Sequence, residues 1–267
     1  MIGDALHLIK AYWNELWEYW TPVIMISIGI IVFVLEAFVG MKAEYGRYNK
    51  KKSGLPAPIA WLIQECPAFF VPLFLIFYNG VKFFDSSNSI NTNLVLLMLF
   101  MMHYFNRSFI YTTRIRSKNV VNYLENFLAF VFCFVNGYQI GHYHSRILKS
   151  DFFEWNFMLG VAIFFTGFYI NIDSDNRLIK LRKESNGTGY KIPKGGMFEY
   201  VSAANYFGEC LEWFGFAIAS WSLPGLAFAW FTLANTGPRG YHHHLFYKEK
   251  FGSDYPKNRK ALIPFLI

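Results

Sequence analysis

The chain has 267 residues, and its apolar stretches are too long and too frequent for the core of a soluble domain. A helix needs about 20 mostly apolar residues to cross a bilayer, and in lipid its backbone must satisfy its own hydrogen bonds. The sequence therefore predicts an all-α polytopic membrane protein. We expect seven transmembrane helices, with ends uncertain by a few residues, at 21–40, 58–78, 93–113, 122–143, 154–174, 199–219 and 226–239.

Lysine and arginine alternate between the segments that join these helices. Twenty of them fall in the first set of segments, which comprises 41–56, 112–121, 175–198 and 239–267. Four fall in the intervening set, which comprises 1–20, 79–92, 144–153 and 220–225. The positive-inside rule predicts that the N-terminus lies outside and the C-terminus in the cytosol, as an odd number of crossings requires. The net charge of +7 then indicates a membrane rather than a nucleic acid.

The chain reads as a single seven-helix membrane domain, 1–267, that lies in the lipid bilayer with no obligate protein partner evident. We find no internal repeat of fixed period in it and expect no cleavable signal peptide. Cys66, Cys133 and Cys210 all fall within predicted helices and form no C-x-x-C pair, so we expect reduced, packed thiols. We expect the inner membrane for a bacterial protein and the endoplasmic reticulum for a eukaryotic one.

Nearly all polar residues inside the apolar stretches lie near one end, and it is the same end of the membrane each time; Asn136 and Gln139 are the main exceptions. At 1.5 Å per residue, Glu65 is roughly 10 Å and Tyr104 roughly 14 Å from the cytosolic side, on adjacent antiparallel helices. Arg107 shares a face with Tyr104 by the i, i+3 rule. Taken singly, Glu65 could cap a helix or pair with Arg107, and Tyr104 could be an ordinary aromatic residue.

Other helices repeat this pattern near the cytosolic side. The residues concerned are Glu36, Asn122, Glu125, Asn126, Asn171, Asp173, Asp175, Arg239 and His242–His244. Asn205, Glu209 and Glu212 form a stripe at i, i+4, i+7, which needs partners when buried and which a polar ligand would supply. Neighbouring helical histidines point about 100° apart, so His242–His244 cannot all bind one ion and no metal is predicted.

The mouth of the expected cavity is basic and its interior carries amides, carboxylates and hydroxyls. This lining suits a long anionic molecule with ribose hydroxyls. Neither G-x-G-x-x-G after a strand nor G-x-x-x-x-G-K-[ST] occurs, so helices would have to form the pocket. The C-terminal segment alternates aromatic and basic residues, and we expect it to cap the cytosolic mouth.

The chain resembles the steroid 5-alpha-reductase family, the membrane 3-oxo-5-alpha-steroid 4-dehydrogenases, over roughly residues 40–267. The matching motifs are YGRY (45–48), AWLIQECP (60–67), MMHYFNRSFIY (101–111), NIDSDNRLIKLRK (171–183), YKIPKGGMFEYVSAANYFGECLEW (190–213), SWSLPGLAFAWF (220–231), RGYHHHLFY (239–247) and DYPKNRKALIPFLI (254–267). We expect a bacterial member of this family.

The resemblance implies an NADPH-dependent enzyme that reduces the 4,5 double bond of 3-oxo-4-ene steroids to 5-alpha products. Its catalytic pair corresponds to Glu65, in QECP, and Tyr104, in HYFNR. Its dinucleotide-binding positions correspond to Arg107, Asn171, Asp175, Arg182, Tyr190, Asn205, Arg239, His243 and Tyr247. To these we add Glu209, from the polar stripe. The cofactor cavity is expected to be formed mainly by 104–267.

Two departures from the family pattern stand out. The loop ESNGTG (184–189) differs in length and composition, which affects local cofactor contacts, and Cys66 replaces a common leucine beside the substrate. Trp61 and Trp213 are candidate substrate-binding residues where an apolar substrate would enter from lipid.

The expected chemistry follows from the catalytic pair. Hydride addition to an enone at its β-carbon leaves negative charge on the carbonyl oxygen, which Tyr104 could stabilise as a donor. Glu65 would orient Tyr104 or, when protonated, donate directly. The alternatives are a reductase of another enone or an enoyl thioester lipid, a membrane methyltransferase, and a non-catalytic transporter or sterol-binding protein.

Overall fold

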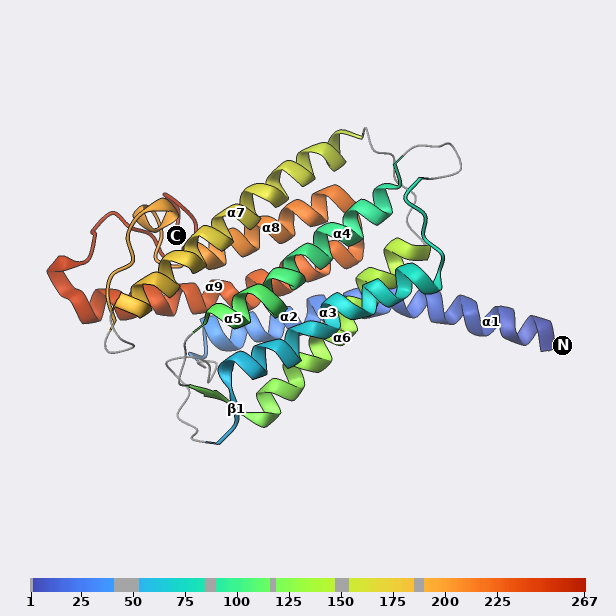
Figure 1. Cartoon of the computed structure of the whole chain (residues 1–267), viewed down its shortest axis with the longest axis horizontal. Helices are drawn as coiled ribbons and strands as arrows, with labels where there is room; N and C mark the ends of the chain where they lie inside the picture. The colour runs from blue at the N-terminus through green and yellow to red at the C-terminus, as the bar shows by residue number, and fades with distance from the viewer. Residues whose placement is uncertain (1, 41–52, 85–89, 116–118, 147–153, 185–189) are drawn as a thin grey trace.

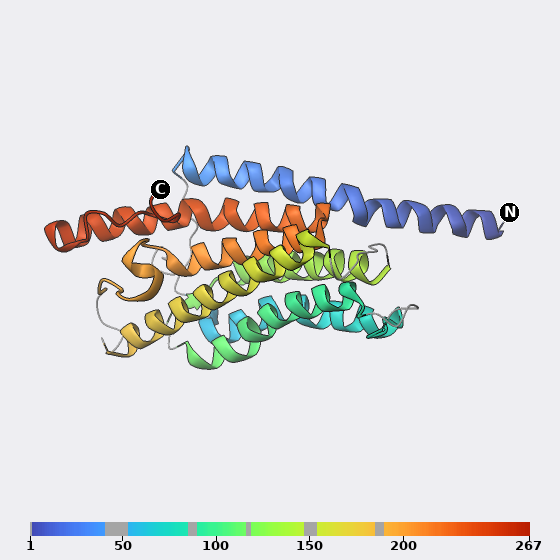
Figure 2. The same cartoon turned by 90° about the horizontal axis from the view of Figure 1, so that it is seen from above.

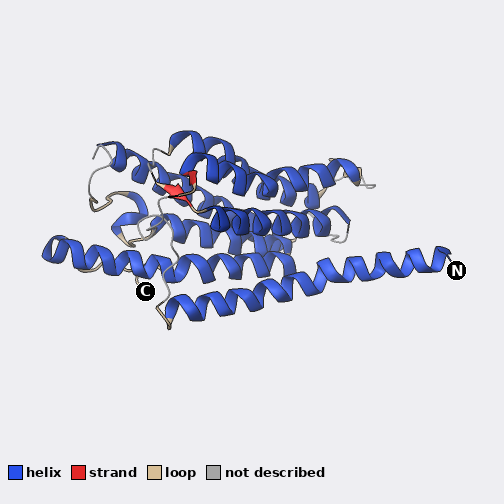
Figure 3. Cartoon of the chain, turned by 90° about the horizontal axis from the view of Figure 1, so that it is seen from below, coloured by secondary structure: helices blue, strands red, loops and turns tan. Residues whose placement is uncertain are grey.

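The computed structural model is a bundle of long helices with a small two-stranded ribbon (Figures 1 and 3). It describes residues 2–40, 53–84, 90–115, 119–146, 154–184 and 190–267, with side chains from residue 7 onward. Most of the predicted basic loop 41–56, the motif YGRY and nearly all of the loop 184–189 lie outside these residues. The short strands β1 (Leu55–Pro56) and β2 (Val120–Val121) pair antiparallel.

Each of the seven predicted ranges falls on a helix. The first range falls on α2 (Thr21–Ala37). This helix continues α1 (Ile2–Glu15), which lies before the predicted range, through the π-helical turn η1 (Leu16–Trp20). In the third, α4 (Thr92–Phe105) continues through the π-helical turn η3 (Asn106–Tyr111) into α5 (Thr112–Arg114). The others are α3 (Ala57–Tyr78), α6 (Tyr123–Arg146), α7 (Trp155–Glu184), α8 (Ala204–Ser220) and α9 (Leu223–Phe251).

These helices confirm the predicted class, an all-α membrane protein. Among the described residues, four helical segments are long and apolar enough to cross a membrane: His7–Ala37, Ala57–Tyr78, Thr92–Arg114 and Trp155–Glu184. Large apolar side chains such as Phe74, Phe77 and Tyr169 are more than 60% exposed on them, as expected for surfaces that face lipid. Of the other three helices, α8 has only 17 residues, and α6 and α9 contain buried polar side chains such as Gln139 and His244.

Three predicted boundaries are wrong. The fifth helix does not end near 174 but continues to Glu184, since Leu178 in its later turns packs against Phe198 and Val201. The sixth helix begins at Ala204 and not at 199, because Gly196–Glu199 form a 3₁₀ turn (η4) and the chain then turns again before the helix. The seventh helix does not end near Arg239 but continues to Phe251, since its later turns pack against the C-terminal segment instead of leaving the bundle. Pro238, inside α9, does not end the helix.

Helices α7 and α8 lie side by side along most of their length (Figure 1). Glycines make this approach possible: Gly167 of α7 faces Gly208 and Glu212 of α8, and Gly208 faces Gly167 and Asn171 in return. A Cβ added at Gly208 would lie 2.5 Å from the backbone nitrogen of Asn171 and 2.9 Å from the carbonyl oxygen of Gly167. Small residues let membrane helices approach closely. This contact sets the polar residues of α7 directly against those of α8.

A second close pair joins α3 and α6. Gly137 and Gly141 of α6 face the backbone of Ala68 and the ring of Pro72 on α3. Pro67, also in α3, has no N–H and cannot donate to the backbone oxygen of Ile63, four residues earlier. The Cys66 thiol donates to this oxygen instead, at 3.5 Å. The apolar core between the two helix pairs is built largely of aromatic rings, with Phe100, Trp213, Phe216 and Phe228 in mutual contact.

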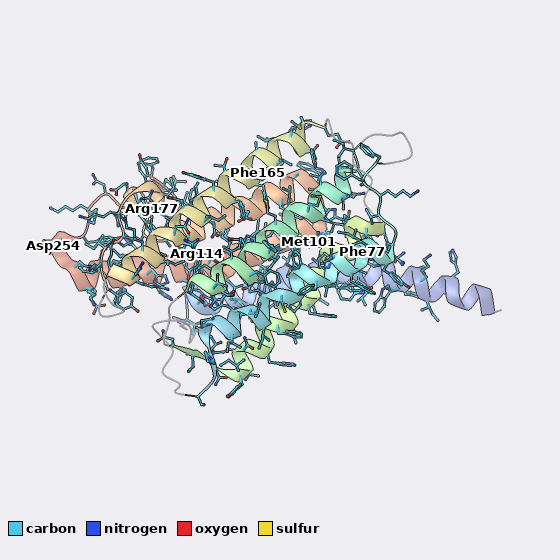
Figure 4. All side chains as sticks on the ribbon, in the orientation of Figure 1. Phe77, Met101, Arg114, Phe165, Arg177 and Asp254 are labelled. Carbon is cyan, nitrogen blue, oxygen red and sulfur yellow. The ribbon has the colours of Figure 1, made fainter. Side chains whose placement is uncertain are left out.

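The two ends of the chain lie at opposite ends of the bundle (Figure 2). After the short 3₁₀ turn η5 (Gly252–Asp254), the C-terminal segment folds back on the start of α8, where Ser202 N donates to Lys260 O at 2.9 Å and Lys260 N donates to Tyr200 O at 2.8 Å. Of the residues labelled in Figure 4, the charged Arg114, Arg177 and Asp254 lie toward this end of the bundle, and Phe77 toward the other.

We expect Gly208→Ala to destabilise the protein by about 1–3 kcal/mol, because its methyl group would collide with backbone atoms of α7 that cannot move independently. Thermal unfolding in detergent measures the effect. Gly237→Ala on α9 is the matched control, since its nearest neighbours are the side-chain carbons of Leu233 and Leu262 at 3.6 and 3.9 Å. Equal melting temperatures for the two variants would contradict the close packing of α7 on α8.

Candidate functional site

Arg107 lies at the start of η3 and joins three helical segments. Its Nη1 donates to Asp175 Oδ2 of α7 at 2.8 Å, and both side chains are about nine-tenths buried. Its guanidinium carbon lies 4.9 Å from the ring centre of Trp61, on α3, and 4.7 Å from that of Tyr111. Two aromatic faces and one carboxylate therefore fix the guanidinium in a single orientation.

Carboxylates from three helices surround this arginine. Besides Asp175, Glu65 of α3 and Glu209 and Glu212 of α8 lie within electrostatic range of Arg107. Carboxylates this close repel one another, so the buried guanidinium stabilises their assembly. The structure thus brings together three of the residues predicted from sequence for the site, Glu65, Asp175 and Glu209, around a fourth.

His103 and Glu212 form a buried pair that the sequence did not predict. His103 Nδ1 lies 2.8 Å from Glu212 Oε1, and the two side chains are 3% and 0% exposed. The imidazole ring contacts the rings of Trp213 and Tyr104, at centroid distances of 4.7 and 5.2 Å. A signal was available, since His103 precedes Arg107 by one helical turn, but the sequence could not identify its partner on α8.

Glu65 and Tyr104 lie in shared surroundings. Cys133 of α6 lies 3.9 Å from Glu65 Oε2 through its sulfur, and both Cys133 and Glu65 are electrostatic neighbours of Tyr104. The Tyr104 ring is 4% exposed and packs on Phe100 at 4.8 Å. The amide of Asn136 adjoins Tyr104 and makes no regular hydrogen bond with the described residues.

Trp61 and Trp213 flank the cluster on different sides. Trp61 covers Arg107 and contacts Tyr111 edge-on at 5.6 Å. Trp213, which is 1% exposed, lies 6.1 Å from Tyr104 between ring centres. Trp61 is partly exposed, whereas Trp213 is fully buried. Of the two, only Trp61 lies near the surface of the bundle.

The polar residues of α7 and α8 meet beside Arg107. Asn171 Nδ2 donates to the backbone oxygen of Asn205 at 2.9 Å. Asn171 Oδ1 and the hydroxyl of Ser174 are buried and accept or donate no hydrogen bond among the described residues. Such atoms normally have partners, so the polar residues of α7 and α8 have hydrogen-bonding capacity that the described residues do not use.

Further predicted residues extend the polar region toward α9. Arg239 lies 3.6 Å from Glu36 Oε1, and the ring of His243 lies 5.7 Å from that of Tyr206. Arg182 is exposed and acts electrostatically on Asp175 and Tyr111. Positive charge therefore continues from the buried cluster to the end of the bundle that holds the C-terminus.

Tyr190 and Tyr247 lie next to the C-terminal part of the chain. Tyr190 contacts Phe246 edge-on at 5.1 Å, and Tyr247 stacks on Tyr255 at 5.8 Å with an interplanar angle of 3°. Tyr247 is eight residues beyond Arg239, or roughly 12 Å along the helix axis. Its contacts do not connect it with Arg107, and its predicted role at the cofactor stays a prediction.

A hydrogen-bonded clamp ties α9 to this C-terminal segment. The Ser202 hydroxyl lies 2.6 Å from His244 Nδ1 and also bonds to the hydroxyl of Tyr255. Burial, together with Lys248, Arg259 and Lys260, lowers the pKa of His244 to about 4. The neutral ring and the Ser202 hydroxyl share one hydrogen bond, and the clamp holds α9 against the segment that precedes α8.

Fold and site together define a helical membrane protein whose bundle encloses ionisable side chains from several helices. The comparisons with known proteins agree with this class: the family model described as 3-oxo-5-alpha-steroid 4-dehydrogenase matches residues 119–267. The chain belongs to this family, the steroid 5-alpha-reductases.

Relatives in animals and plants resemble the chain over most of its length. The 3-oxo-5-alpha-steroid 4-dehydrogenase 1 of Bos taurus is 43% identical over 248 residues, which is 90% of this chain and 93% of the relative. The 3-oxo-5-alpha-steroid 4-dehydrogenase 2 of Sus scrofa is 44% identical over 87% and 91%. The steroid 5-alpha-reductase DET2 of Arabidopsis thaliana is 39% identical over 85% and 88%. These relatives are eukaryotic, and the bacterial origin expected from the sequence stays a prediction.

We expect Asp175→Leu to reduce the free energy of unfolding by about 3–5 kcal/mol, because it leaves the buried Arg107 guanidinium without its carboxylate. Asp173→Leu is the control on the same helix. It removes an i, i+4 pair with Arg177 that is partly exposed, and its expected cost is below about 1 kcal/mol. Unfolding in mixed micelles measures both, and equal losses would mean that the Arg107–Asp175 pair is not the one that stabilises the bundle.

Proposed function

We propose that this protein is an NADPH-dependent reductase that converts the 4,5 double bond of 3-oxo-4-ene steroids to the 5-alpha product. The relatives that cover most of the chain are named for this activity. The observation that carries the proposal is that Glu65 and Tyr104 share one buried environment, beside the polar residues at which α7 and α8 meet.

In this proposal the chain crosses the bilayer seven times, with its N-terminus outside and its C-terminus in the cytosol. Two observations support an odd number of crossings: all seven predicted ranges fall on helices, and the chain ends lie at opposite ends of the bundle (Figure 2). The single domain 1–267 would then present these polar residues and the basic residues near them to the cytosol. We infer an endoplasmic reticulum or bacterial inner-membrane location.

The polar residues of α7, α8 and α9 have the chemistry that an anionic dinucleotide requires. Amide and hydroxyl atoms of Asn171 and Ser174 are buried without partners among the described residues, as is Nε of Arg239. Carboxylates suit ribose hydroxyls, and arginines suit phosphates. We therefore assign NADPH to this region, held by Arg107, Asn171, Asp175, Arg182, Tyr190, Asn205, Glu209, Arg239, His243 and Tyr247.

NADPH, when bound, supplies a hydride to the β-carbon of the enone. Negative charge then develops on the carbonyl oxygen of the substrate, and the Tyr104 hydroxyl is the donor that can stabilise it. Glu65 orients that hydroxyl or, when protonated, donates to the same oxygen. His103, fixed by Glu212, holds one side of the Tyr104 ring, and Trp213 excludes water from another. A fixed donor in a dry site costs little reorganisation during the reaction.

The steroid would reach this site from the lipid, with Trp61 at the entrance and Trp213 at the inner wall. Trp61 is partly exposed, whereas Trp213 is buried among Phe100, Phe216 and Phe228. Loss of absorbance from NADPH, followed with a panel of 3-oxo-4-ene steroids, tests the activity directly. Turnover only with other enones or enoyl thioesters would show that the substrate is not a 3-oxo-4-ene steroid. Sterol binding without any use of NADPH, or methyl transfer from S-adenosylmethionine, would overturn the proposal.

We expect Glu65→Gln and Tyr104→Phe each to lower turnover about 10²- to 10³-fold, with NADPH binding retained, because each removes a group that acts on the carbonyl oxygen. Glu154→Gln and Tyr169→Phe are the matched controls, since both side chains are exposed away from the site. Steady-state rates with a 3-oxo-4-ene steroid measure the effect. Rates within a few-fold of the unmodified protein for both site variants would exclude the pair from catalysis.

We expect Arg239→Ala to weaken NADPH binding about 10- to 100-fold, because a charge-assisted hydrogen bond to a phosphate contributes about 1.5–3 kcal/mol. Titration calorimetry in detergent measures the Kd. Arg146→Ala is the control, since Arg146 bonds to Asn79 at the opposite end of the bundle. An unchanged Kd for Arg239→Ala would place the cofactor elsewhere.

A further inference from the structure

A row of polar side chains runs along α6 away from the catalytic pair, toward the end of the bundle that holds the N-terminus. Cys133, Asn136, Gln139 and His142 follow one another in steps of three residues. Residues at i and i+3 are neighbours on a helix surface, and each step advances about 4.5 Å along the axis. Each step also rotates the side chain by about 60° around the helix, so the row spans roughly 13 Å along the axis, about half the thickness of a hydrocarbon core, and winds about half-way around α6.

Three members of this row are buried polar side chains. Asn136 and Gln139 are 0% exposed and His142 is 1% exposed. Both polar atoms of Gln139 and of His142 lack a partner among the described residues, and the amide of Asn136 has only the Tyr104 hydroxyl beside it. A buried, unsatisfied polar atom is costly, and native proteins satisfy groups of such atoms with internal water. Three such residues in adjacent positions along one helix indicate a line of water sites.

The inner end of the row reaches the catalytic pair. Cys133 lies 3.9 Å from Glu65 through its sulfur, and Asn136, one step further along the helix, adjoins Tyr104. The water sites would therefore begin at the atoms that meet the substrate carbonyl in the proposed reaction.

The outer end of the row reaches η1. His142 stacks on Tyr138 at 5.6 Å, and Tyr138 contacts Trp17 at 4.4 Å. Trp17 Nε1 and Asn14 Oδ1 are again buried without a partner among the described residues. π-Helical turns such as η1 are uncommon and frequent at functional sites. Beyond this turn α1 extends past the rest of the bundle (Figure 2).

We propose that the Asn136–Gln139–His142 row holds a file of water molecules that supplies protons to the active site from the outer face of the membrane. This inference rests on the reductase function proposed above. Reduction of an enone consumes one hydride at the β-carbon and one proton at the α-carbon. The proton comes from water of the file, and the hydroxide left behind is neutralised by a proton that passes inward along the file. Amide and imidazole groups both donate and accept, so they can line such a path.

Hydroxyl-radical footprinting of the purified protein tests the water file without requiring activity. After correction for intrinsic reactivity, we expect His142 to take up several-fold more oxygen from the solvent than Phe157, which is equally buried at 1% exposure in an apolar setting. Labelling of His142 at the level of Phe157 would overturn the water file, whether or not the protein reduces steroids.

Proteoliposomes that enclose a pH-sensitive dye test the direction of proton uptake. NADPH added outside selects molecules whose cofactor site faces outward, and a 3-oxo-4-ene steroid starts the reaction. We expect the interior to become alkaline by one proton for each NADPH oxidised, and a protonophore to abolish this change. Steroid reduction with an unchanged interior pH would overturn the outer proton path while leaving the reductase function intact.

Gln139→Leu provides the variant that breaks the row in its middle. We expect it to lower turnover several-fold and to remove most of the interior alkalinisation. Asn156→Leu is the matched control: this buried amide lies near the start of α7 and already donates to the Ile218 oxygen at 3.3 Å. Equal alkalinisation per NADPH in the two variants would overturn the path through Gln139.

Discussion

The buried Arg107–Asp175 ion pair is the interaction on which the site depends. It connects η3 with α7, and the stacking of Arg107 on Trp61 adds α3. Burying a guanidinium is unfavourable unless its charge is compensated, and here Glu65, Glu209 and Asp175 all lie within range of it. The same charge allows several carboxylates to be buried near one another, which hydrophobic packing alone would not permit.

The helix pairs fix where these charges stand. Because Gly167 and Gly208 let the backbones of α7 and α8 nearly touch, Asn171 reaches the backbone of Asn205. Gly137 plays the corresponding part between α6 and α3, which brings Cys133 beside Glu65. The cluster is thus held by backbone-to-backbone packing rather than by long side chains. Rigid elements of this kind maintain the precise donor positions that electrostatic catalysis needs.

The two halves of the bundle differ in what their polar groups do. Toward the C-terminal end, basic residues and amides lie together beside the clamp of Ser202 and His244. Toward the N-terminal end, Gln139 and His142 of α6 are buried without partners among the described residues. Both regions meet at Tyr104. A reaction that needs a hydride and a proton can draw them from opposite sides of such a site.

Much of this could be predicted from the sequence, because depth along a helix follows directly from residue number. The apolar runs located seven helices, and the rise per residue placed Glu65 and Tyr104 at similar depths, where they do share surroundings. The sequence also identified Arg107, Asp175 and Glu209. The extension of α9 to Phe251 was missed, since its later turns are stabilised by tertiary contacts and not by apolar periodicity.

Only the tertiary structure determined which side chains of different helices contact one another. The pairing of His103 with Glu212, 109 residues away, and the two rings that enclose Arg107 depend on rotation about each helix axis and on the π-helical turn η3. Residue spacing within one helix carries no information about the rotation of its neighbour. The sequence therefore determined which side chains lie at the level of the site, and packing determined which of them touch.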